Sequence, residues 1–173
     1  VWEGRYRAEG KEFLLGQHGF ARDMDFTLVS STETQARYRL EFSDETLAKY
    51  PYPFVLEIAY RLRGNAIDVI WEVENPSEGD IWFQIGAHPA FYYPDYDARK
   101  QERGYLSFDR NTGLECIRIK EKGCVDAETK YAMDIPDNGR LPMSASSFDA
   151  IDTIMLQDSQ IGEVTLHRTD GTP

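Results

Sequence analysis

Apolar and polar residues alternate with a period of two through most of the chain, and this pattern predicts β-strands with one buried face. The clearest pair spans Phe54 to Leu62 and Ile67 to Glu74. Gly64-Asn65 lies between them and predicts a two-residue hairpin turn, because both residue types tolerate positive φ. Further short strands are expected over residues 12–15, 24–30, 35–42, 105–108, 114–119, 130–133, 152–156 and 163–168.

The polar face of this hairpin carries opposite charges on its two strands. We expect Arg61 and Arg63 to pair with Asp68 and Glu72 across the hairpin. Each cross-strand pair should stabilise the hairpin by about a few tenths of a kcal/mol. These residues therefore belong to the scaffold.

One stretch, residues 43–50, predicts a single helical turn. Ser43 or Asp44 can cap its start, and Pro51 and Pro53 prevent it from continuing. The chain shows no repeat, low-complexity tract or linker, and its 173 residues with 41% hydrophobic content can form one core. We expect a single all-β domain over residues 1–173, an antiparallel β-sandwich.

The stretch from Asp80 to Asp97 carries the most chemical information. Residues 81, 83, 85 and 87 alternate with Trp82, Gln84, Gly86 and His88, which predicts a third strand of a meander that ends at His88. Because Pro89 keeps the preceding backbone extended, the imidazole would be held at the strand end. An indole, an amide, a glycine and an imidazole on one face indicate a polar small-molecule site.

Aromatic residues follow His88 and are interleaved with proline and aspartate. Phe91, Tyr92, Tyr93 and Tyr96 offer flat surfaces that suit the apolar C–H faces of a sugar ring, beside groups that can bind its hydroxyls. A histidine at a strand end is more often a structural residue, so spacing alone does not assign catalysis to His88.

Two motifs about seventy residues apart carry a resemblance to a known family. The segments are His18-Gly19-Phe20-Ala21-Arg22-Asp23 and Gly86-Ala87-His88-Pro89-Ala90-Phe91. Together they resemble the aldose 1-epimerase (galactose mutarotase) family, in the bacterial branch with a His-Gly-Phe-Ala-Arg motif, which is also seen in hexose-6-phosphate mutarotases. The resemblance implies a β-sandwich of the galactose mutarotase type, here incomplete at both ends.

The same resemblance implies roles for individual residues. His88 would be the catalytic acid, and His18 would assist at the ring oxygen. Arg22, Phe91 and Asp152 would bind the sugar or its phosphate, with Asp149 as the second choice for the aspartate. The reaction requires no metal or redox cofactor, and the two cysteines have no metal-site spacing.

The family's catalytic base is a glutamate near the C-terminus, and nothing from Glu163 to Pro173 matches its surroundings. We expect this base beyond Pro173, in a longer polypeptide of which the chain is an internal piece. Asp95 and Asp97 would be poor substitutes, so the 173 residues alone should lack efficient epimerase activity.

The formal net charge of −11 argues against nucleic acid as a partner, since phosphate contacts need clustered lysine and arginine. A phosphosugar would need a local basic pocket, for which Arg22, Arg61 and Arg63 are candidates. No apolar run is long enough to cross a membrane. We expect a cytoplasmic monomer or homodimer that acts on a small-molecule sugar.

Two further expectations concern isolated residues. Cys116 and Cys124 flank a possible hairpin, but without a secretion signal two unpaired thiols are favoured. His167 alternates with Val164 and Leu166, which predicts an outward, solvent-facing imidazole.

Two other functions stay open at this stage. A non-catalytic sugar-binding module would keep the aromatic surface without turnover. A glycoside hydrolase would use paired carboxylates, but it leaves the two histidine motifs unexplained.

Overall fold

The structure is a computed structural model that describes residues 2–94, 97, 99–121, 124–149 and 153–173. The chain divides into two compact units, residues 1–87 and 88–173. The described elements are almost all antiparallel β-strands, as the alternation predicts. The expectation of one domain over residues 1–173 stays a prediction.

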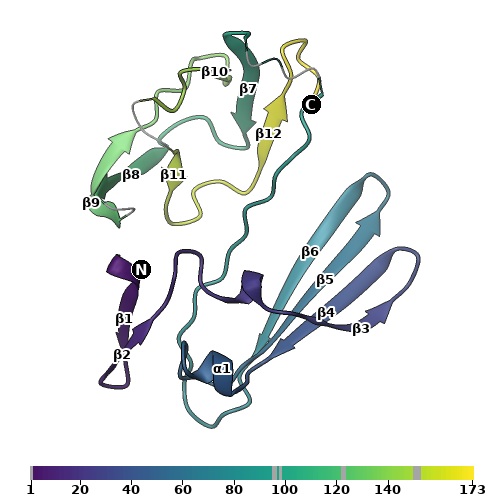
Figure 1. Cartoon of the computed structure of the whole chain (residues 1–173). Coiled ribbons are helices and arrows are strands. Elements are labelled where there is room, and N and C mark those ends of the chain that lie inside the picture. The colour runs from purple at the N-terminus through teal and green to yellow at the C-terminus, as the bar shows by residue number, and fades with distance from the viewer. Residues whose placement is uncertain (1, 95–96, 98, 122–123, 150–152) are drawn as a thin grey trace. The chain divides into compact units, whose positions relative to one another are not determined.

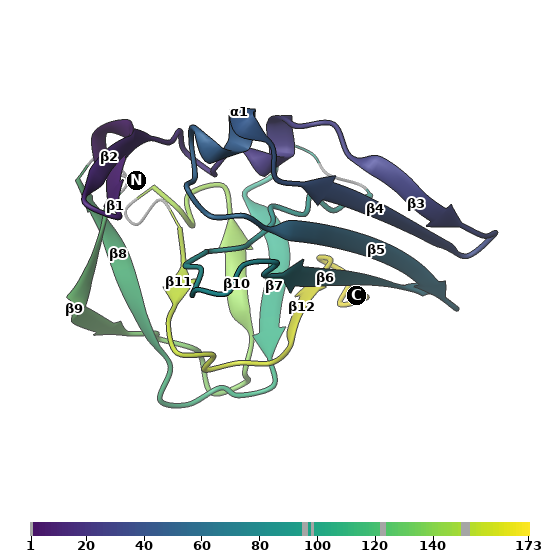
Figure 2. The ribbon, with the colours of Figure 1, turned by 90° about the horizontal axis from the view of Figure 1, so that it is seen from below.

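The first unit is built on a four-stranded antiparallel sheet in the order β3-β4-β5-β6 (Figures 1 and 2). Its strands are β3 (Thr27–Ser31), β4 (Gln35–Glu41), β5 (Val55–Arg63) and β6 (Ala66–Glu74). The other elements of this unit are the hairpin β1 (Arg5–Ala8) and β2 (Lys11–Leu14), the 3-10 helices η1 (Trp2–Gly4) and η2 (Ala21–Asp23), and the helix α1 (Asp44–Leu47).

The β5–β6 hairpin forms as expected, with Arg63 opposite Ala66 and positive φ at Gly64. Arg63 donates through Nε and Nη2 to the two carboxylate oxygens of Asp68, at 3.0 and 2.9 Å. These hydrogen bonds hold the pKa of Asp68 below its usual value. Only part of the predicted charge pairing is therefore present, because Glu72 contacts Arg37 of β4 instead.

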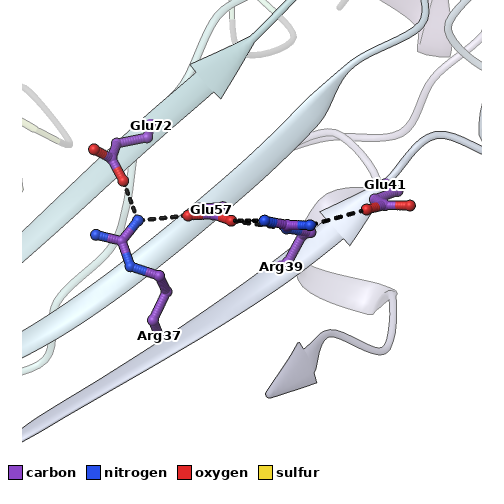
Figure 3. A network of polar contacts seen from close by, with 5 residues as sticks. All are labelled: Arg37, Arg39, Glu41, Glu57 and Glu72. Atoms are coloured by element: carbon purple, nitrogen blue, oxygen red, sulfur yellow. Dashed lines mark hydrogen bonds and ion pairs between the residues drawn. The ribbon is translucent and has the colours of Figure 1, made fainter. Parts of the chain in front are cut away.

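The two faces of the sheet differ in character. On the apolar face, Leu40 and Leu56 are buried with Phe54 and form the core cluster of the unit. On the polar face, five charged side chains from three strands form one network (Figure 3). Its members are Arg37, Arg39 and Glu41 of β4, Glu57 of β5 and Glu72 of β6.

The predicted helical turn is confirmed as α1. The Ser43 Oγ accepts from the Thr46 N–H at 3.3 Å, and the Thr46 Oγ1 accepts from the Ser43 N–H at 2.8 Å. This reciprocal capping satisfies two N–H groups that a helix start leaves unpaired. The main chain then makes a last turn, in which the Tyr50 N–H donates to the Thr46 carbonyl at 2.7 Å.

The second unit contains two three-stranded antiparallel sheets, in the orders β10-β7-β12 and β11-β8-β9. Leu114 and Ile117 are its buried apolar residues in the described chain. Cys116 and Cys124 are free thiols, as expected. The strands are β7 (Glu102–Phe108), β8 (Glu115–Glu121), β9 (Cys124–Ala132), β10 (Leu141–Ser144), β11 (Met155–Leu156) and β12 (Val164–His167).

The prediction of a strand that ends at His88 is wrong. Residues 75–94 contain no strand in the structure, and the side chains of Trp82, Phe83 and Ile85 are 72%, 52% and 45% exposed. Alternation marks two faces of an extended segment, but a strand also needs a neighbour to share ladder hydrogen bonds. No described strand pairs with this segment.

Candidate functional site

The first histidine motif forms a turn that leads into η2. His18 and Gly19 have φ of +67° and +73°, and the Gly19 N–H donates to the Gly16 carbonyl at 3.3 Å. Glycine adopts this left-handed conformation freely, whereas it costs a residue with a Cβ roughly 1–2 kcal/mol. Glu3, Glu9, Asp158 and Ser159 also have positive φ, so this conformation makes His18 a candidate functional residue without assigning it a role.

The rest of the motif is anchored in the core of the first unit. The Phe20 ring centroid lies 5.9 Å from that of Phe54 and 6.2 Å from that of Tyr50. Ala21 and Met24 also pack against the core cluster. The apolar residues of the motif therefore fix a short segment whose polar residues stay outside.

His18, Arg22 and Asp23 are the exposed polar residues of this segment. The Arg22 Nε lies 3.6 Å from the Asp23 Oδ1, and the two side chains are 61% and 70% exposed. An ion pair this exposed contributes at most about 1 kcal/mol, so a ligand anion can replace it at small cost. The segment thus presents an imidazole and a guanidinium four residues apart.

Tyr50 connects this segment to the one that leads toward the second motif. Its ring contacts Phe20, and its hydroxyl donates to the Trp82 carbonyl at 3.0 Å. Burial raises the pKa of Tyr50, so its hydroxyl keeps its proton at neutral pH.

The second motif runs from the last two residues of the first unit, Gly86 and Ala87, into the second unit and has no regular secondary structure. Phe91 and Tyr92 are 78% and 89% exposed. Tyr93 closes the segment, since its hydroxyl donates to the Arg103 carbonyl of β7 at 3.0 Å. His88 therefore lies in a segment without helix or strand, between Trp82, whose carbonyl accepts from Tyr50, and Tyr93, whose hydroxyl donates to Arg103.

The structure thus brings together part of the predicted site. His18 and Arg22 share one anchored segment of the first unit, whereas His88 and Phe91 belong to the second. The convergence of the two histidines on one sugar stays a prediction. Asp152 lies outside the described residues, and the alternative Asp149 is exposed in a turn.

Asp97 is the described one of the two carboxylates considered as substitute bases. Arg99 donates to both of its oxygens, each at 2.9 Å, and these hydrogen bonds lower the pKa of Asp97. A carboxylate stabilised in this way is a weaker base. A nearby cavity of about 50 Å³, lined in part by Tyr93 and Arg168, is smaller than the roughly 300 Å³ of a typical small-molecule site.

His167 is placed differently from the expectation. Thr165 and His167 are half-buried, and Val164 and Leu166 are 51% and 39% exposed, so the outward and inward faces of β12 are reversed. The pairing with β7 sets His167 opposite Tyr105, and the Tyr105 ring covers the imidazole on that face.

The buried side of β12 contains a small polar and aromatic cluster. The His167 ring stacks on Tyr105 with centroids 4.4 Å apart and planes 10° apart, and the His167 Nε2 lies 2.8 Å from the Ser107 Oγ. The guanidinium of Arg140 lies 4.7 Å from the Tyr105 ring centroid. Alternation within β12 alone does not show these partners, which come from two other parts of the chain.

Solved structures place the architecture in the class of galactose mutarotase-like β proteins. The chain is similar to a galactose mutarotase related enzyme from Lactobacillus acidophilus, with a TM-score of 0.83 and 26% identity, covering 97% of this chain and 55% of that one. It also resembles a galactose mutarotase-like protein from Lactobacillus casei ATCC 334, with a TM-score of 0.73 and 22% identity, covering 97% and 57%.

The sequence comparison identifies the family directly. Residues 5–170 match the aldose 1-epimerase family, and the chain belongs to that family. Among curated relatives it is similar to the chromosomal and plasmid forms of protein LacX from Lactococcus lactis subsp. lactis, at 35% identity over 130 residues for each. These alignments cover 72% of this chain and 44% of each relative, so the aligned part is less than half of the relatives' length.

The described helices include none that is both long enough and apolar enough to span a membrane.

Proposed function

We propose that the chain is part of an aldose 1-epimerase that interconverts the α and β anomers of a hexose. The observation that carries the proposal is the first motif, in which a half-buried Phe20 packs on the core and His18 has a left-handed backbone conformation near the exposed Arg22. Membership of the aldose 1-epimerase family supports the same reading.

The reaction needs an acid and a base at opposite ends of the hemiacetal. The base removes the proton of the C1 hydroxyl, the oxygen's electrons form the C1 carbonyl, and the bond from C1 to the ring oxygen breaks. The acid gives its proton to the departing ring oxygen, and both transfers reverse when the ring closes on the other carbonyl face.

Residues of this chain would supply the acidic half of that reaction. The imidazolium of His88 is proposed as the acid, because a histidine carries an exchangeable proton near neutral pH. His18 is proposed to hydrogen-bond the ring oxygen, while Arg22, Asp152 and Phe91 bind the rest of the sugar. The base is proposed to be a glutamate that follows Pro173 in the full gene product.

A hexose-6-phosphate is the second candidate substrate. The guanidinium of Arg22 favours it, because this group is exposed and carries N–H donors that suit phosphate oxygens. Arg63, another candidate for phosphate binding, is bound to Asp68 at two points and contributes no open site. Replacing Arg22 by Leu should therefore weaken binding of the phosphosugar more than binding of the free sugar.

The decisive measurement is anomer exchange in the full gene product, followed by polarimetry or NMR with freshly dissolved glucose, galactose and their 6-phosphates. His88→Ala should lower the turnover number by about 10²-fold or more, the usual contribution of general acid catalysis, while weak sugar binding remains. His167→Gln is the matched control, since His167 is bound within its own cluster, and it should keep most of the turnover.

Two results would contradict the proposal. A full gene product that binds sugar without catalysing exchange would be a sugar-binding module. Equal rates for the full gene product and for residues 1–173 would refute a base located beyond Pro173.

A further inference from the structure

The two motif-bearing segments are both attached to a single side chain of the first unit. Tyr50, which follows α1, contacts Phe20 through its ring and the Trp82 carbonyl through its hydroxyl. Phe20 is two residues after His18, and Trp82 is six residues before His88. Neither motif includes Tyr50, which lies between them in sequence.

The ring of Tyr50 is held from several sides. Besides Phe20, it contacts Phe54 with centroids 5.9 Å apart and Tyr52 with centroids 5.1 Å apart, both in edge-to-face geometry. Its backbone N–H donates to the Thr46 carbonyl at the end of α1. Aromatic contacts of this kind and a main-chain hydrogen bond leave the ring little freedom to move.

The hydroxyl of Tyr50 acts on a segment that has no strand partner among the described residues. Such a segment depends on individual side-chain contacts for its position, since no described ladder fixes its carbonyls. The hydrogen bond from Tyr50 to the Trp82 carbonyl is 3.0 Å long and fixes one point of it. Ile81, the preceding residue, packs against the core cluster and fixes a second point.

We propose that Tyr50 is a positioning residue for the epimerase reaction. Its ring fixes the segment of His18 and Arg22 through Phe20, and its hydroxyl fixes the start of the segment that leads to His88. This inference rests on the proposed function, but its structural half can be measured without turnover. A misplacement of about 1 Å at a reacting group can cost up to about 10²-fold in rate, so loss of one fixed point should be visible in turnover.

Tyr50→Phe removes only the hydroxyl and is the test variant. Tyr52→Phe is the matched control, because Tyr52 lies in the same aromatic group and its hydroxyl contacts Glu9 instead. In the full gene product, Tyr50→Phe should lower the turnover number by about tenfold, with a smaller change in KM. Tyr52→Phe should leave both values near those of the parent protein.

NMR chemical shifts of the same proteins show, without any turnover, which contacts of Tyr50 are lost in each variant. Tyr50→Phe should shift the Trp82 carbonyl carbon and the Phe83 amide, which belong to the peptide group that accepts the hydrogen bond, and should leave the His18 imidazole signals unchanged. Tyr50→Leu should shift both sets, because the ring contact with Phe20 is lost as well. The His167 signals serve as an internal reference in the second unit.

The outcomes separate the two claims. Unchanged signals of Trp82 and Phe83 in Tyr50→Phe, or equal losses of turnover in Tyr50→Phe and Tyr52→Phe, would overturn the positioning role. A parent protein without anomer exchange would instead refute the proposed function, and the NMR comparison would then still decide whether Tyr50 fixes both segments.

Discussion

His18 has, at the residue scale, a backbone conformation that carries a cost in stability. Its φ of +67° is unfavourable for any residue with a Cβ. Alanine at this position keeps that cost, and glycine removes it, while both remove the imidazole. The difference in stability between the alanine and glycine variants therefore reports the cost of the backbone conformation alone, because the imidazole is absent from both.

We expect His18→Gly to be more stable than His18→Ala by about 0.5 to 1 kcal/mol. Glycine avoids the cost of the left-handed conformation, but the larger conformational entropy of glycine in the unfolded chain offsets part of that gain. Urea unfolding of both variants measures this difference. Gln17 is the control position, since it is exposed and does not have positive φ, and there the alanine variant should be the more stable one. The same order at both positions would contradict a strained His18.

At the scale of elements, the charge network on the polar face joins β4, β5 and β6 through one carboxylate. Glu57 accepts from Arg37 and from the Arg39 Nε, the latter at 2.7 Å, and its side chain is 16% exposed. These hydrogen bonds lower the pKa of Glu57 in the folded protein. The carboxylate therefore stabilises the fold above its unfolded pKa, and this contribution is lost as the pH falls through the folded pKa.

Glu57→Gln should be less stable than the parent protein at pH 7, and the difference should shrink as the pH falls below about 4, near the ordinary pKa of glutamate. Denaturant unfolding across this pH range measures the change. Glu12→Gln, at an exposed carboxylate that pairs with Arg5, is the control and should cost less at pH 7. A gap between parent and Glu57→Gln that stays constant down to pH 3 would rule out the role of ionisation.

The elements also show where a pattern of alternation is sufficient. The alternation located β5 and β6 well, because the apolar face, the polar face and the turn at Gly64 are all compatible with the same pairing register. It missed β1 and β10, which have only four residues each and, in β10, a proline. It also assigned a strand before His88, since the sequence of one segment does not show whether a partner strand lies beside it.

For the whole molecule, the motifs gave the family and two exposed candidate site residues, but not how the candidate residues are arranged. His18 and Arg22 were predictable because they belong to one continuous segment. Tyr50 was not, because its role depends on contacts with residues 30 or more positions away on either side. The predicted convergence of His88 and His18 on one sugar would depend on packing across about seventy residues of intervening chain, which no local pattern encodes.

Net charge and exposed apolar surface have opposite effects on the association of the whole chain. The apolar face of the sheet continues beyond the core to Tyr60, Leu62 and Ile67, which are 44%, 52% and 64% exposed. Ile67 lies on β6, an edge strand of its sheet. At pH 7 the excess of 30 acidic over 19 basic residues opposes association of such faces, and protonation near pH 4 removes this repulsion.

Light scattering of residues 1–173 should therefore rise as the pH falls from 7 toward about 4. Ile67→Lys should scatter less than Ser30→Lys at every pH, because both add one positive charge but only the first interrupts the apolar face; Ser30 lies on β3 opposite Arg37. The comparison between these two variants cancels the shift in net charge that either causes. Equal scattering by both would show that charge alone controls association, and that the exposed face of β5 and β6 plays no part in it.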